Sequence, residues 1–193
     1  MAAPTPFQRK LATIAQDQYE KYHLIREAQE PLASQIEDYW KDLGFDFPGV
    51  GEAWSAVFVS WCLKQAGATK SQFRFAAMHS EFVRQAIKNA SNGNGSGAFL
   101  GRPVDQYAPK IGDILQNNRA GNHFDFAYAR SHSSYKSHSA IVMEVGSDNK
   151  GNYLRTIGGN ESDSVGLKEV RLTSSGLVRN PDGLYISVIE TTL

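Results

Sequence analysis

Hydrophobic residues at helical spacing mark the first part of the chain. They are Phe7, Leu11, Ile14, Tyr22 and Ile25. Thr5 and Pro6 come just before them and are typical of a helix start, because a side-chain oxygen can accept from free N–H groups and proline presets φ. We therefore expect a first helix from Pro6 and a second, short helix over Leu32–Trp40.

The segment Ala53–Ala66 is apolar on most sides, which is typical of a buried helix, and Gly67 is expected to end it. A further helix is predicted over His79–Asn89. The glycine- and asparagine-rich segment Ser91–Gly97 is expected to be a flexible loop.

The hydrophobic period then changes to that of strands. Strands are predicted over Ile111–Leu115, Ala140–Val145, Tyr153–Ile157 and Leu184–Ile189, with a long polar insert over Asn117–Ser137. Helices first and strands later predict an α+β fold with an antiparallel sheet.

Length and charge narrow the class of protein. The 193 residues suggest one domain, with residues 1–50 as a helical extension packed on a main domain over 51–193. The net charge of +0 argues against non-specific nucleic-acid binding. No apolar run reaches the roughly 18 residues that span a bilayer, and the first ten residues lack the pattern of a signal peptide. The single cysteine, Cys62, excludes an internal disulfide.

Three short segments carry candidate chemistry. Ser55 is expected in the first turn of the buried helix, where free N–H groups and the helix dipole favour a nucleophile and an oxyanion. His138 opens a predicted strand, and Asn160 follows two glycines at the end of the next. A nucleophile, a base and an orienting amide in this order fit acyl transfer. Helix capping by Ser55 and a plain turn at Asn160 stay open as alternatives.

Other polar residues give weaker signals. His123, Asp125 and His132 could join His138 around a metal, but their spacing matches no zinc pattern. We therefore expect neither a metal nor a cofactor. Arg119 and Arg130 are candidates for binding a carboxylate of a peptide stem, with a solvated surface position as the alternative.

The order of motifs resembles the CHAP and NlpC-type cell-wall amidases. The matching segments are Trp54–Gly67, Pro109–Ile114, Ser137–Val142 and Gly158–Asn160. The resemblance implies a papain-like fold, in which N-terminal helices pack on a small antiparallel sheet. It also implies a cysteine-peptidase-like amidohydrolase, with Ser55 where those enzymes have the nucleophilic cysteine.

A second resemblance is closer. An uncharacterised bacterial family of the same superfamily has Trp-Ser-Ala, Ala-x-His-Ser and His-Cys-Asp-Ile-Val-Val motifs, which are similar to Trp54–Ala56, Ala77–Ser80 and His138–Met143. In this version His79 is the base and position 139, here Ser139, holds the nucleophile. Both geometries stay open. Each serine is either natural or a replacement of cysteine, and a serine hydroxyl is the poorer nucleophile.

Members of that family look like peptidoglycan-directed toxins delivered by type VI secretion. The resemblance thus implies an amidase or endopeptidase that acts on peptidoglycan peptide stems in the periplasm of a target cell. Its implied partners are an immunity protein and a secretion-system carrier. Two alternatives are a non-catalytic wall-binding module on the same fold and a phage lysis enzyme.

Overall fold

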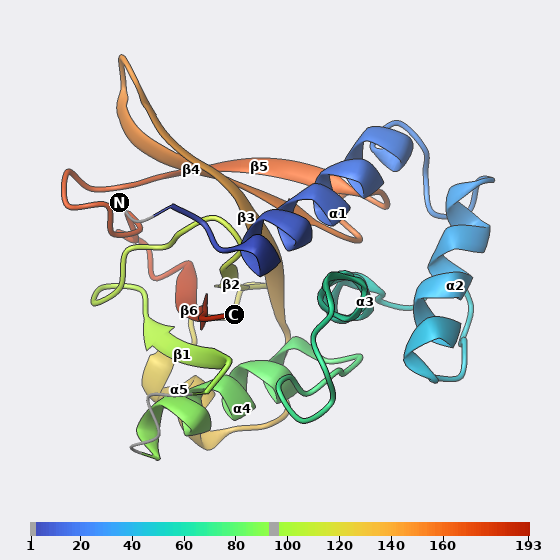
Figure 1. Cartoon of the computed structure of the whole chain (residues 1–193), viewed down its shortest axis with the longest axis horizontal. Coiled ribbons are helices and arrows are strands. Elements are labelled where there is room, and N and C mark those ends of the chain that lie inside the picture. Colours follow the sequence, from blue (N-terminus) through green and yellow to red (C-terminus); the bar gives the residue numbers. More distant parts are fainter. Residues whose placement is uncertain (1–2, 93–96) are drawn as a thin grey trace.

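The protein has an α+β fold in which N-terminal helices pack against a six-stranded antiparallel sheet (Figure 1). The structure is a computed structural model that describes residues 3–92 and 97–193. Its helices are α1 (Pro6–Tyr22), α2 (Leu32–Leu43), α3 (Ser55–Ala66), α4 (His79–Ser91) and α5 (Phe126–Ser131). Its strands are β1 (Phe99–Pro103), β2 (Ile114–Asn118), β3 (Ser137–Asp148), β4 (Gly151–Gly158), β5 (Gly166–Arg171) and β6 (Tyr185–Thr191). They lie in the order β1-β6-β2-β3-β4-β5.

The predicted helices are confirmed. Thr5 caps α1 in a capping box with Gln8, and Pro6 is the first helical residue. Gly67 ends α3 in the left-handed conformation, as predicted. The strand predicted from Ile111 was wrong at its start: Gly112 turns with a φ of 84°, and β2 begins only at Ile114.

Three elements were not predicted. β1 is short and ends in a proline, and β5 is an edge strand whose side chains are mostly exposed, so neither has a hydrophobic period. α5 lies within the predicted polar insert, where Asp125 caps a helix of only six residues. Most of the loop predicted over residues 91–97 lies outside the described residues.

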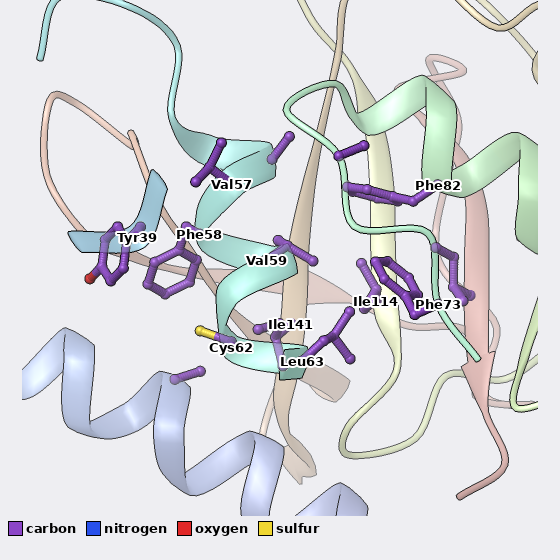
Figure 2. Packing of buried hydrophobic residues seen from close by; sticks show 14 of the residues in the cluster. Tyr39, Val57, Phe58, Val59, Cys62, Leu63, Phe73, Phe82, Ile114 and Ile141 are labelled. Atoms are coloured by element: carbon purple, nitrogen blue, oxygen red, sulfur yellow. The ribbon is translucent and has the colours of Figure 1, made fainter. Parts of the chain in front are cut away.

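The core is centred on α3, which is surrounded by other elements and therefore apolar on most sides (Figure 2). Tyr39 of α2 packs on Phe58, and Ile141 of β3 belongs to the same cluster. Cys62 is fully buried there, and burial raises the pKa of its thiol well above the usual range. Helices α1 and α2 share this core with the sheet, while the predicted division at residue 50 stays a prediction.

Candidate functional site

The starts of two helices meet at the candidate nucleophile. Ser55 is the first residue of α3 and His79 the first residue of α4, and the Ser55 Oγ lies 2.7 Å from the His79 Nε2. The connecting loop is held by Ser60, whose Oγ donates to the Ala76 carbonyl at 3.0 Å and accepts from the Ala76 N–H at 3.1 Å. Ser55 thus pairs with His79, whereas the first sequence hypothesis paired it with His138.

The start of α3 offers free N–H groups beside the Ser55 hydroxyl. The first helical bond runs from the Phe58 N–H to the Trp54 carbonyl at 2.9 Å, and no side-chain cap from Trp54 covers this end. The N–H groups of Ser55, Ala56 and Val57 therefore have no acceptor within the helix. Such groups, at the positive end of the helix dipole, can stabilise an oxyanion.

His79 is suited to accept a proton. Burial lowers its pKa well below the usual range, and the neighbouring His138 and Arg119 lower that pKa further. The imidazole is therefore neutral at neutral pH. Within the described residues its buried Nδ1 has no hydrogen-bond partner. A buried polar atom left unpaired costs about 1–3 kcal/mol, so the site is not built for stability alone.

A second histidine lies behind the first. The rings of His79 and His138 meet edge to face, with centroids 5.3 Å apart. The His138 Nε2 lies 2.8 Å from the Glu161 Oε1, and the Glu161 Oε2 lies 2.9 Å from the Lys168 Nζ. Burial alone would raise the pKa of Glu161, but His138 and Lys168 outweigh it and hold that pKa below its usual range. A series of polar side chains therefore runs from Ser55 through His79, His138 and Glu161 to the exposed Lys168.

The turn that carries Glu161 is held in an unusual backbone conformation. Asn160, Ser162 and Asp163 have φ values of 54°, 55° and 60°, which non-glycine residues rarely adopt. A Cβ on Gly158 would lie 2.6 Å from the Glu161 Oε1 and 2.9 Å from the His138 Nε2. A larger residue here would therefore displace the Glu161 carboxylate or the His138 ring. Strain of this kind is typical of functional sites.

N-terminal residues support the same turn. The Ser164 Oγ donates to the Tyr22 carbonyl at 2.8 Å, and the Glu27 N–H donates to the Asp163 carbonyl at 2.7 Å. The Glu27 carboxylate also accepts from the Trp54 Nε1 at 2.8 Å, beside Ser55. The segment between α1 and α2 thus ties the Glu161 turn to the start of α3.

The remaining predicted residues lie differently. The Asn160 side chain has no hydrogen-bond partner among the described residues, and Glu161, the next residue, holds His138. Ser139 is fully buried with its Oγ unpaired in that same part of the chain. It points to the opposite face of β3 from His138, because neighbouring side chains of a strand alternate. The catalytic roles of Asn160 and Ser139 stay predictions.

A cleft of about 530 Å³ opens onto the Ser55–His79 pair. Arg119 and Lys136 line it, and no aspartate or glutamate does among the residues described. Arg119 thus lines the cleft, Arg130 does not, and carboxylate binding by either arginine stays a prediction.

Two of the residues considered as metal ligands, Asp125 and His132, have local contacts instead. Asp125 accepts from the Tyr128 N–H at 2.7 Å, and the His132 ring stacks on Tyr128 with centroids 3.8 Å apart. Over residues 3–92 and 97–193, no group of His, Cys, Asp and Glu side chains could hold a metal ion. Within those ranges, no helix has the length and apolar character needed to cross a membrane.

The family model described as "Uncharacterized protein conserved in bacteria (DUF2272)" matches residues 13–188. The chain belongs to this family. Membership in an uncharacterised bacterial family is thus confirmed, and the match assigns DUF2272 to no wider superfamily. Neither the curated proteins nor the solved structures contain a match. The DUF2272 region includes Ser55, His79, His138 and Glu161.

Proposed function

We propose that this protein is a papain-like hydrolase that cleaves amide bonds of cell-wall peptides by acyl transfer, with Ser55 as nucleophile and His79 as base. The observation that carries the proposal is the 2.7 Å contact between the Ser55 Oγ and the His79 Nε2 at an uncapped helix start. A nucleophile, a neutral imidazole and free N–H groups are the parts that acyl transfer requires. The motif order shared with CHAP and NlpC-type amidases supports the substrate class.

The proposed reaction has two halves. As the Ser55 Oγ attacks the amide carbonyl, the His79 Nε2 takes the hydroxyl proton, and N–H groups of α3 bind the oxyanion. His79 then returns the proton to the leaving amine, and the acyl group stays on Ser55 as an ester. In the second half, His79 takes a proton from water, whose oxygen attacks the ester carbonyl. His79 then returns this proton to the Ser55 Oγ as the ester bond breaks, which releases the acid and the free serine.

His138 and Glu161 act as positioning residues in this scheme. His79 becomes positive when it takes the proton, and its neighbour His138 is bound to the Glu161 carboxylate at 2.8 Å. The Glu161 carboxylate offsets part of the repulsion that His138 exerts on His79 once His79 has taken up the proton.

We extend the proposal to the biological setting. The resemblance supports an antibacterial effector that a type VI system carries to the periplasm of a target cell, with an immunity protein as its partner. A second function is a non-catalytic wall-binding module. The observation that favours it is a serine, the poorer nucleophile, at a position that is only 2% exposed.

Digestion of purified sacculi tests the proposal. We expect new amines and shortened muropeptides with the unchanged chain or with Ser55→Cys, and none with Ser55→Ala, as read by mass spectrometry. Turnover that appears only with Ser139→Cys would move the nucleophile to position 139. Binding to sacculi without release in every version would favour the wall-binding module.

A further inference from the structure

A second hollow continues the cleft along α4. It has a volume of about 290 Å³. Met78 and Ser134 line both hollows, so the two lie side by side at the start of α4 and form a pair, one member of which holds Ser55 and His79. We call this pair of hollows the α4 groove.

The α4 groove concentrates positive charge on a chain whose net charge is +0. Arg119 and Lys136 line the cleft end, and Arg84 and Lys88 line the far end. The far end also holds Arg74, which Glu81 neutralises at 2.5 Å. A groove lined by one sign of charge attracts ligands of the opposite sign.

Arg84 carries an unsatisfied donor in this groove. Its Nε is buried and has no hydrogen-bond partner among the described residues. A guanidinium has five N–H donors in a planar fork that matches a carboxylate. A carboxylate in the hollow would pair with the terminal N–H groups of this fork.

We propose that the α4 groove binds an acidic peptide, with one carboxylate at Arg119 and Lys136 and a second at Arg84 and Lys88. The bond that Ser55 cuts would then lie between the two carboxylates, and this point rests on the proposed function. The binding of the peptide does not rest on it. A peptide is favoured over single-stranded nucleic acid, which binds to exposed aromatic side chains. Among the described residues, Tyr135 is the one phenylalanine, tyrosine or tryptophan that lines either hollow, and both Tyr135 and the His79 ring are buried.

Fluorescence anisotropy tests this with the Ser55→Ala protein, which removes turnover from the measurement. The probes are a labelled hexapeptide of alternating Glu and Ala and its twin with Gln for Glu. We expect the Glu peptide to bind at least about tenfold more tightly than the Gln peptide. Arg84→Gln with Lys88→Gln is expected to remove most of that difference. Arg9→Gln with Lys10→Gln, which removes two exposed cations from α1, is the matched control and is expected to leave the difference unchanged.

The outcomes separate this inference from the proposed function. Equal binding of the two peptides, or tighter binding of a single-stranded DNA oligonucleotide, would overturn the acidic-peptide groove even if sacculi are digested. Preference for the Glu peptide that depends on Arg84 and Lys88 would support the groove even if no digestion is found.

Discussion

Two clusters of buried polar side chains in this protein differ in whether all their polar atoms have hydrogen-bond partners. Asp113, just before β2, accepts from the Tyr107 hydroxyl at 2.9 Å, the Lys110 N–H at 2.8 Å and the Thr191 N–H at 2.9 Å. The cluster of Ser55 and His79 instead leaves the His79 Nδ1 without a partner in the described residues.

The difference indicates two kinds of role. The Asp113 cluster joins the start of β2 to the end of β6, and its hydrogen bonds specify the packing of the sheet. The Ser55–His79 cluster faces a cleft and keeps hydrogen-bonding capacity unused, which costs stability. Proteins accept such costs where they need reactivity.

Replacing the central residue of each cluster with leucine gives the largest expected contrast. His79→Leu removes the base and is expected to lower sacculus digestion at least about a thousandfold. It removes the unpaired Nδ1, which stabilises the fold, but it also leaves the buried Ser55 Oγ without its partner. These two effects offset each other, so we expect the free energy of unfolding to change by less than about 1 kcal/mol. Digestion rates and urea unfolding measure the two effects.

Asp113→Leu is expected to do the opposite. Burial raises the pKa of Asp113 to about 6, so the change removes a costly carboxylate. It also leaves three donors unpaired, which outweighs that relief, and we expect a loss of about 2 kcal/mol with activity per folded molecule preserved. A strongly destabilised His79→Leu, or an inactive but folded Asp113→Leu, would break the contrast.

Gly158→Ala sharpens the same comparison, because it displaces the Glu161 carboxylate that holds His138. The new Cβ would lie 2.6 Å from the Glu161 Oε1, so we expect about 2 kcal/mol of destabilisation together with reduced digestion. The matched control is Gly51→Ala, because a Cβ at Gly51 meets nothing within 4 Å. Equal melting temperatures for the two variants would show that the close approach at Gly158 is unimportant.

Glu161→Gln is expected to have the smallest effect on stability and on digestion. The lowered pKa of Glu161 means that its charge stabilises the fold above the unfolded pKa, about 4.5, and that this contribution is lost as the pH falls through the folded value. We therefore expect a deficit of about 1 kcal/mol at pH 7 that shrinks towards pH 3, with digestion lowered about tenfold and its pH profile shifted.

Glu169→Gln is the control for this change, because its carboxylate lies in exposed ion pairs with Arg155 and Arg171. An unchanged pH profile of digestion in Glu161→Gln would show that Glu161 has only a structural role.

The sequence predicted those elements that have a strong local signal. Helix α1 has both a capping box and a hydrophobic period, and α3 is apolar on most sides because other elements surround it. Edge strand β5 has no such signal, since its pairing with β4 depends on backbone bonds and not on a buried face.

The site was predictable by residue but not by pairing. Ser55, His79 and His138 were all candidates, yet their partners depend on how the starts of α3, α4 and β3 meet in space. Glu161 was missed because the family motif ends at Asn160. The preceding Gly158-Gly159 pair was the available signal, since close backbone approach requires glycine.

Labelling with a fluorophosphonate tests the central claim most directly. The reagent forms a phosphorus–oxygen bond to a serine hydroxyl that a neighbouring base deprotonates, and fluoride leaves. We predict that peptide mass spectrometry finds the adduct on Ser55 in the unchanged chain and in Asp113→Leu, and that His79→Leu loses it. An adduct on another serine, no adduct at all, or full labelling of His79→Leu would contradict the assignment of Ser55 and His79 as the reactive pair.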